Sequence, residues 1–131
     1  MPIIKPMPTV LLLDPDEVAR QTLAHILAPR FRTIDAATIE KAIQQIIIHR
    51  PQIIVLEYNL PDGDALAFVR QLRSDAFMRQ SIIVFVTHRS TIKDKVAGFQ
   101  SGADDYVVKP VNTETFVYRL LLLQRLPRSV A

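Results

Sequence analysis

Cysteine is absent from the chain of 131 residues. Its absence excludes disulfide bonds, thiol catalysis and metal sites built on cysteine. A cysteine-free chain suits the reducing cytoplasm, where we expect the protein to act. No apolar stretch reaches the length of a membrane-spanning helix. The segment from Met1 to Pro8 contains three prolines and lacks the apolar core of a signal peptide, so we predict neither secretion nor membrane binding.

A dominant charge is also missing. The chain has 16 lysine and arginine residues against 13 aspartate and glutamate residues, a formal net charge of +3. The basic residues are scattered along the sequence, which argues against a nucleic-acid surface. We therefore expect no direct partner of that kind.

Short apolar runs alternate with amphipathic segments. Continuous runs typical of buried strands extend over Thr9 to Leu13, Ile53 to Leu56 and Ile82 to Val86. Weaker strands are predicted from Phe31 to Asp35 and from Tyr106 to Val108. Five strands in one short chain predict a single compact sheet.

Between these runs, apolar residues recur at helical spacing. The clearest stripe follows the pattern i, i+3, i+4, i+7, i+8 and consists of Ile39, Ala42, Ile43, Ile46 and Ile47. Strands that alternate with helices predict an α/β fold, in which helices cover both faces of a parallel sheet. We assign one domain to residues 9–126, an extension to residues 1–8 and a tail to residues 127–131.

Polar side chains follow four of the predicted strands. They are Asp14 and Asp16, Glu57 and Asn59, Thr87, and Lys109. Ligands of open parallel sheets bind outside the carboxyl ends of the strands. Carboxylates, a hydroxyl and an ammonium at one edge can hold a divalent cation and a phosphoryl group.

Four segments resemble the receiver domains of two-component signalling. LLLDPDE, IIVLEYNLPDGD, IIVFVT and GADDYVVKP occur in the order and spacing of that family, and the resemblance extends from Thr9 to about Arg125. It implies a flavodoxin-like fold with strand order 2-1-3-4-5. It also implies a site where Mg²⁺ assists phosphoryl transfer from a histidine kinase to an aspartate, and protein partners such as a kinase, an output domain or a regulator.

The resemblance gives roles to five residues. Thr87 corresponds to the switch hydroxyl that moves toward the phosphoryl group, and Lys109 corresponds to the ammonium that pairs with the acceptor. Pro110 corresponds to a proline that follows a cis bond. Tyr106 corresponds to the aromatic residue whose inward or outward rotamer reports the signalling state, and Asp14 to the first acid of the usual acidic pair.

Two departures from the family fall on essential positions. Glu57 stands in place of the phosphorylated aspartate, and misplacing a nucleophile by about 1 Å can cost about 100-fold in rate. Pro15 replaces an acid that binds Mg²⁺ directly, while Asp16 is better placed to cap a helix. We predict no ordinary phosphorylation, no catalytic residue and weak or absent Mg²⁺ binding, for which Asp14, Glu57 and Asn59 are weak candidates.

The longer side chain of Glu57 can reach Lys109 or Thr87 and partly imitate the charge of a phosphoaspartate. The hypothesis is a receiver held permanently in one signalling state. A carboxylate has less charge and fewer oxygens than a phosphoryl group. A receiver that is still phosphorylated on Glu57 or on another carboxylate is the alternative.

A strand that ends in Asp14-x-Asp16 also resembles phosphatases of the haloacid-dehalogenase type. In those enzymes the first aspartate is the nucleophile and the second is the acid–base. The order of the motifs argues against this alternative, because lysine follows the acidic pair Asp104-Asp105 here. No cap region follows Asp14 either, so we expect no enzyme, and we interpret Asp104 and Asp105 as loop carboxylates.

The last predicted helix carries two apolar faces. One face suffices for docking on the sheet and consists of Phe116, Val117, Leu120 and Leu123. Tyr118, Leu121 and Leu122 lie on another face, and exposed leucines beside a tyrosine are typical of partner surfaces. In the receiver family the fourth helix, fifth strand and fifth helix form the common dimer and output surface. We predict a homodimer or domain docking through these three residues; the alternative is that the C-terminal tail covers them.

Overall fold

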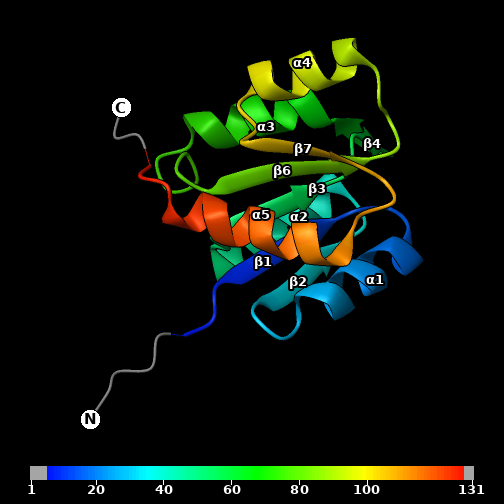
Figure 1. The fold of residues 1–131 in the computed structure, drawn as a ribbon. Helices are drawn as coiled ribbons and strands as arrows, with labels where there is room; N and C mark the ends of the chain where they lie inside the picture. Colours follow the sequence, from blue (N-terminus) through cyan, green and yellow to red (C-terminus); the bar gives the residue numbers. More distant parts are fainter. Residues whose placement is uncertain (1–5, 129–131) are drawn as a thin grey trace.

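The computed structural model describes residues 6–128, and Figure 1 shows them as a sheet between two layers of helices. The five-stranded parallel sheet has the order β2-β1-β3-β6-β7. Its strands are β1 (Thr9–Leu13), β2 (Arg32–Ala36), β3 (Ile53–Leu56), β6 (Ile82–Thr87) and β7 (Asp105–Val108). The predicted order 2-1-3-4-5 is confirmed, because β6 and β7 are the fourth and fifth strands of this sheet.

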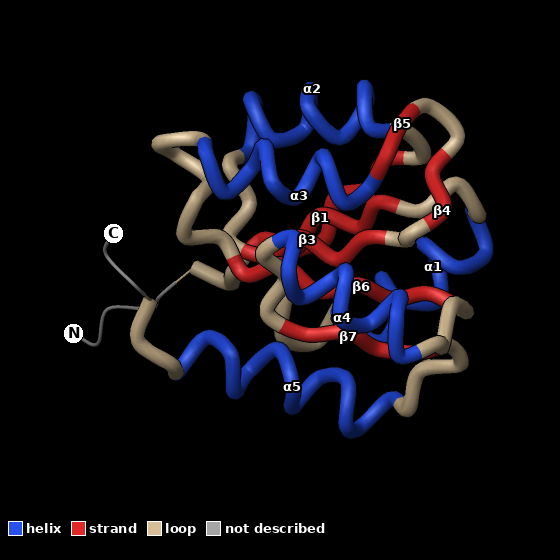
Figure 2. Tube along the Cα trace, turned by 90° about the horizontal axis from the view of Figure 1, so that it is seen from above, coloured by secondary structure: helices blue, strands red, loops and turns tan. Residues whose placement is uncertain are grey.

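Helices cover both faces of the sheet, as Figure 2 shows from above. They are α1 (Glu17–Leu27), α2 (Ile39–His49), α3 (Ala65–Ser74), α4 (Ile92–Ser101) and α5 (Thr113–Arg125). Side chains of α2 and α3 join one apolar core, and those of α1 and α5 join the other. Helix α4 packs against α3 and β7. None of the helices within residues 6–128 has the length and apolar character needed to span a membrane.

Burial on both faces explains the continuous apolar runs. Along β1, Val10 and Leu12 point into one core while Leu11 and Leu13 point into the other, because side chains alternate along a strand. A strand with only one buried face would need a polar residue at every second position. The continuous apolar runs of the strands therefore indicated that helices cover both faces of the sheet.

Each helix begins at a side chain that accepts a hydrogen bond from the first turn. The N-caps are Asp16, Thr38, Asp64, Thr91 and Asn112. Such caps satisfy backbone N–H groups that have no partner within the helix. The cap of α1, Asp16, was predicted.

A short hairpin that was not predicted joins β3 to α3. It consists of β4 (Asn59–Leu60) and β5 (Gly63–Asp64), and Asp62 lies at its turn. The Asp62 carboxylate accepts hydrogen bonds from the backbone N–H groups of Ile39 at 2.9 Å and Glu40 at 3.1 Å. These bonds lower the pKa of Asp62. The hairpin is thus tied to the start of α2, which fixes the loop beside Glu57.

The apolar residues of α4 lie mainly on its exposed face. The stripe of α4 is exposed by 79% at Ile92, 47% at Val96 and 48% at Phe99. The buried residues of α4 are Gly98 and Ser101 instead. Apolar spacing does not identify the inward face of this helix, because α4 packs on small residues.

Candidate functional site

Four side chains from four strand ends lie together at the carboxyl edge of the sheet. The Lys109 Nζ atom lies 2.7 Å from Asp14 Oδ2 and 3.7 Å from Glu57 Oε2. The Thr87 hydroxyl donates a hydrogen bond to Glu57 Oε1 at 3.0 Å. These residues follow β1, β3 and β7 directly or end β6, so the parallel sheet itself gathers them. The Lys109–Pro110 bond is cis, as expected.

The cluster is almost completely shielded from solvent. Asp14 is 5% exposed, Glu57 8% and Thr87 0%. Backbone bonds hold their positions, since Glu57 N–H donates to Leu13 O at 2.8 Å and Lys109 N–H donates to Thr87 O at 2.8 Å. One ammonium thus faces two carboxylates in a site of low polarity, where charge interactions are stronger than at the surface.

One oxygen of this cluster lacks a hydrogen bond. Glu57 Oε2 is buried and has no hydrogen-bond partner among residues 6–128; its nearest charged neighbour is the Lys109 ammonium. A buried polar atom without a partner is uncommon and costs free energy. Glu57 is therefore anchored through one oxygen only, the one that Thr87 holds.

Most of the oxygens that could coordinate Mg²⁺, which takes several oxygen ligands in an octahedral arrangement, already have partners within the protein. Asp14 Oδ2 is bound to Lys109, and Asp14 Oδ1 accepts the N–H of Asp16 at 2.9 Å. The Asn59 Oδ1 atom accepts a bond from the Arg89 guanidinium at 2.9 Å. No group of three or more histidine, aspartate or glutamate side chains within the described residues could hold a metal ion.

Asp16 lies outside the cluster. It is exposed, and its Oδ1 atom accepts the N–H of Val18 at 3.0 Å as the cap of α1. Of the two acids assigned to the pocket, only Asp14 therefore contacts Lys109. The reason is the turn after β1, in which Asp14 continues the strand and Asp16 already begins the helix.

Tyr106 lies inward beside the cluster. It is 7% exposed, its ring centroid lies 5.8 Å from that of Phe85, and its hydroxyl donates to the carbonyl of Arg89 at 2.8 Å. Burial raises the pKa of Tyr106 to about 12. A Cβ atom at Gly98 would lie 2.9 Å from Tyr106 Cδ2, so the ring occupies space that only glycine leaves open.

Two arginines that the sequence analysis missed brace the site. Arg20 donates to the carbonyl of Asp14 at 2.7 Å and to the Asp35 carboxylate at 2.9 Å. The Arg89 guanidinium lies 4.3 Å from the ring centroid of Tyr58 and also reaches the hairpin and α4. A long side chain can point in many directions, and nothing in the sequence pattern fixes which one it takes.

The predicted docking residues lie on the side of α5 that faces α1. Tyr118 is 67% exposed and Leu122 is 58% exposed, whereas Leu121 is half-buried against the core. All three line a hollow together with Arg30, which follows α1. None of them lines the hollow between α4, β7 and α5. All three therefore lie beside the loop that follows α1, whereas Thr115, Phe116 and Arg119 of α5 line the hollow beside α4 and β7.

The start of the C-terminal tail takes a different direction. Arg128 donates to both carboxylate oxygens of Asp104, at 3.1 and 3.0 Å, and to the carbonyls of Gln80 and Ser81. Residues 126–128 therefore do not cover Tyr118. The remaining tail residues, 129–131, and residues 1–5 of the predicted extension lie outside the described residues.

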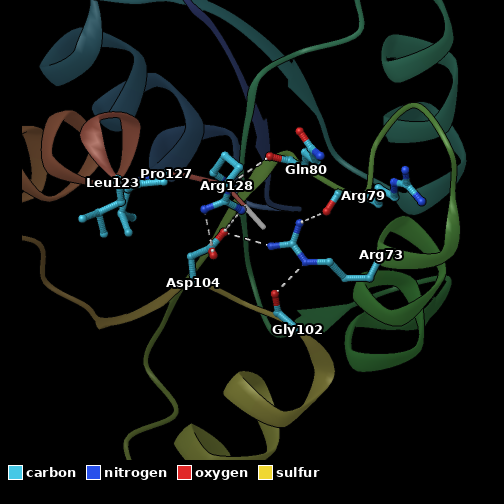
Figure 3. A pocket seen from close by; sticks show the side chains of 9 residues that line it. Arg73, Arg79, Gln80, Gly102, Asp104, Leu123, Pro127 and Arg128 are labelled. Carbon is cyan, nitrogen blue, oxygen red and sulfur yellow. Dashed lines mark hydrogen bonds and ion pairs between the residues drawn. The ribbon is translucent and has the colours of Figure 1, made fainter. Parts of the chain in front are cut away.

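Asp104 is the centre of a second polar cluster, at the amino edge of the sheet (Figure 3). Its Oδ2 atom accepts from Arg73 at 2.9 Å, from Arg128 at 3.0 Å and from the N–H of Ile83 at 2.9 Å. Burial lowers the pKa of Arg73, and Asp104 opposes that shift. Asp104 lies in the loop before β7, as expected, but two arginines distant in sequence converge on it, and Asp105 is the first residue of β7 instead of a loop carboxylate.

Comparison with known proteins is consistent with this geometry. Residues 10–121 match the response regulator receiver domain. The chain is 29% identical over 117 residues to the phosphate regulon transcriptional regulatory protein PhoB of Klebsiella pneumoniae, covering 88% of this chain and 51% of that protein. It is 35% identical over 120 residues to the transcriptional regulatory protein AfsQ1 of Streptomyces coelicolor, covering 91% and 52%. The chain thus spans about half the length of these curated relatives.

Among solved structures, a putative response regulator from Chloroflexus aurantiacus superposes with a TM-score of 0.85. It is 30% identical in sequence, and the match covers 92% of this chain and 100% of the other. Both the sequence and the strand order therefore agree with one family.

Proposed function

The chain belongs to the response-regulator receiver family of two-component signalling, and from that premise we propose that it works without phosphorylation and signals through contacts with other proteins. One observation carries the proposal. The Thr87 hydroxyl already donates to Glu57 at 3.0 Å while Tyr106 lies inward. In the family, as the resemblance implies, the hydroxyl moves toward a phosphoryl group. Here a carboxylate occupies that role permanently.

The state of the acceptor supports the loss of phosphorylation. A nucleophile must be correctly placed for in-line attack. Glu57 Oε2 has no hydrogen bond among the described residues, but it stands on a side chain one methylene longer than the aspartate of the family. Pro15 offers no oxygen from its side chain where a metal ligand is expected. We propose that Mg²⁺ binds weakly or not at all and that ordinary transfer from a kinase fails.

The arrangement of the acids also supports a role other than that of an enzyme. The phosphatase alternative requires Asp14 as nucleophile and Asp16 as acid–base. Both Asp14 oxygens are engaged, by Lys109 and by a backbone N–H, while Asp16 caps α1. A nucleophile held in an ion pair and an acid turned away from it are poorly arranged for that reaction.

A chemical test of the proposal uses acetyl phosphate with Mg²⁺ and intact-protein mass spectrometry. We expect no phosphoryl adduct on the parent chain and little on Glu57→Asp alone. The double variant Glu57→Asp with Pro15→Asp restores both the acceptor and the metal ligand, so it should bind Mg²⁺ and form an adduct. A stoichiometric adduct on the parent chain would show that the proposal is wrong. Efficient labelling of the single variant would show that the metal defect is overrated.

We further propose that the α1–α5 side mediates partner contacts, either in a homodimer or with a kinase, output domain or other regulator in the cytoplasm. Tyr118 and Leu122 expose more than half of their surface there, next to the cations Arg30 and Arg125. Exposed aromatic and aliphatic side chains beside arginine are typical of interface centres.

Sedimentation equilibrium tests this surface. Tyr118→Ser with Leu122→Ser should lower self-association at least about tenfold, because the central apolar contacts of an interface carry most of its affinity. The matched control is Ile47→Ser, since Ile47 is 70% exposed on α2. A dimer that survives the double variant and dissociates in the control would place the interface on the other layer of helices. A monomeric parent chain would exclude the homodimer.

A further inference from the structure

We propose that Arg89 is a second lock on the switch, independent of Glu57, which holds Tyr106 inward by strapping the β3–β4 segment to α4. The inference rests on the proposed function, because it concerns the same switch. Arg89 follows Thr87 by two residues and lies in the loop between β6 and α4. The resemblance to the family assigned it no role.

The guanidinium of Arg89 connects three groups from two parts of the chain. Its Cζ atom lies 4.3 Å from the centroid of the Tyr58 ring, a distance typical of a cation–π contact. It donates to Asn59 Oδ1 at 2.9 Å and to Asp94 Oδ1 at 3.0 Å. Tyr58 and Asn59 follow β3, whereas Asp94 lies in the first turn of α4. The planar fork of arginine can satisfy all three at once.

The backbone of Arg89 touches both switch residues. Its N–H donates to Thr87 Oγ1 at 3.3 Å, and its carbonyl accepts the Tyr106 hydroxyl at 2.8 Å. Any displacement of the Arg89 backbone therefore changes the surroundings of both side chains. The strap fixes that backbone, since the guanidinium ties it to the hairpin and to α4. Arg89 is thus a positioning residue for Tyr106.

Arg89 and Glu57 reach the switch from different sides. Glu57 is buried at the end of β3, while the Arg89 side chain is 41% exposed and lies in the surface loop. Both contact Thr87, but only Arg89 contacts the Tyr106 hydroxyl. Because the strap is accessible to water, it can open without disturbing the buried cluster.

Arg89 and Asp94, the ion pair within the strap, both remain charged at neutral pH. The hydrogen bond from Arg89 lowers the pKa of Asp94. A carboxyl whose folded pKa lies below its unfolded one stabilises the fold above the unfolded value, and that contribution is lost only as the pH falls through the folded pKa. The ion pair is therefore fully formed near pH 7. Being partly exposed, it is weak, and we expect the whole strap to bias Tyr106 by about tenfold.

Fluorine NMR of the full chain labelled with 3-fluorotyrosine tests the lock. The chain has only three tyrosines, Tyr58, Tyr106 and Tyr118, so each signal can be assigned with one phenylalanine variant. A soluble gadolinium chelate then relaxes each fluorine according to its exposure. In Arg89→Ala the relaxation of Tyr106 should rise toward that of Tyr118, which is exposed in the parent chain. Arg89→Lys keeps the charge without the fork and should be intermediate.

The matched control is Arg70→Ala, since Arg70 is exposed on α3. It should leave the Tyr106 signal as in the parent chain. Unchanged relaxation of Tyr106 in Arg89→Ala would overturn the lock, and an equal rise in both variants would do the same. Loss of the folded state is detected separately, because the Tyr58 and Tyr118 signals would then merge with that of Tyr106.

The outcome is separable from the acetyl phosphate test. A parent chain that forms no adduct, with Tyr106 unmoved in Arg89→Ala, would refute the lock and leave the proposed function intact. A parent chain that forms an adduct, with Tyr106 released in Arg89→Ala, would do the reverse. If the two devices are independent, Glu57→Ala, which removes the acceptor of the Thr87 hydroxyl, and Arg89→Ala should release Tyr106 by factors that multiply in the double variant. A double variant no more exposed than either single one would refute the independence.

Discussion

The two edges of the sheet each hold a carboxylate beside cations, but the two carboxylates are bonded very differently. At the amino edge, Asp104 uses both oxygens, for two arginines and a backbone N–H. At the carboxyl edge, Glu57 uses one oxygen for Thr87 and leaves the other without a hydrogen bond among the described residues. Glu57 is also the more buried of the two side chains, at 10% exposure against 20%.

This difference makes the cluster around Asp104 a structural one and leaves the cluster around Glu57 able to rearrange. A network whose members are all satisfied rigidifies the chain around it, whereas a partly satisfied one stores unfavourable free energy. Asp104 joins α3, the strands and the beginning of the tail, and both of its carboxylate oxygens accept hydrogen bonds. Glu57 holds the Thr87 hydroxyl at 3.0 Å and the Lys109 ammonium at 3.7 Å, an arrangement that a small change can alter. Variants that remove one charge at each edge test this contrast.

The largest effect is expected for Asp104→Asn. The amide keeps the shape but has no negative charge, and its NH2 group cannot accept the bonds that one carboxylate oxygen accepted, which leaves half-buried cations facing each other. We expect the free energy of unfolding to fall by about 3 kcal/mol in urea denaturation. Asp105→Asn is the control, because Asp105 pairs with the more exposed Arg119 and should cost less than about 1 kcal/mol. Equal losses in the free energy of unfolding would mean that the complete hydrogen bonding of Asp104 adds no stability beyond that of an ordinary ion pair.

Lys109→Met should come next. It removes the ammonium that pairs with Asp14 and Glu57, and the two buried carboxylates then repel one another. A loss of about 2 kcal/mol in the free energy of unfolding is expected. Lys41→Met, at an exposed position of α2, should change the free energy by less than about 0.5 kcal/mol. A neutral result for Lys109→Met would indicate that the cluster is more hydrated than its burial suggests.

A smaller loss is expected for the parent chain in alkali. The folded pKa of Tyr106, about 12, exceeds its ordinary value of 10.0. Its contribution to stability is therefore complete below the unfolded pKa and is lost as the pH rises through the folded one. Between about pH 8 and about pH 11 the parent chain should lose about 1 kcal/mol more than Tyr106→Phe. Parallel pH profiles of the two proteins would contradict the burial of the hydroxyl.

The smallest effect on stability is expected for Glu57→Gln. The amide retains an oxygen for Thr87, and Lys109 keeps its contact with Asp14. The variant should stay within about 1 kcal/mol of the parent chain, either above or below it, because the lost oxygen had no hydrogen bond. A loss as large as that of Asp104→Asn would show that both edges are structural clusters and would remove the contrast.

The backbone of the fold could be predicted because short-range patterns specify it. Continuous runs such as Ile82 to Val86 require burial on both faces, and caps such as Asn112 require only neighbouring N–H groups. Lys109 and Asp14 are 95 residues apart, yet their meeting followed from strand order alone, since each directly follows a strand. The parallel sheet turns that order into proximity.

What could not be predicted depends on side-chain direction over long separations. Arg128 reaches Asp104 across 24 residues, and Arg89 reaches Asn59 across 30, with no periodic signal for either. Similarly, the apolar spacing of Ile92 and Val96 located α4 without showing that its inward residues are small. The place of Tyr118 beside α1 also depends on the rotation of α5, which spacing alone does not define.

Gly98 affects the position of the Tyr106 ring through steric contact alone. An added methyl group would raise the helix propensity of α4 by about 1 kcal/mol, and yet it would meet the Tyr106 ring at 2.9 Å. Alanine at this position would therefore strengthen the helix while evicting the aromatic ring, with every charged group left as it is. The missing side chain of Gly98 thus permits the inward position of Tyr106, and a single substitution there could change that position while leaving the electrostatics of the site as they are.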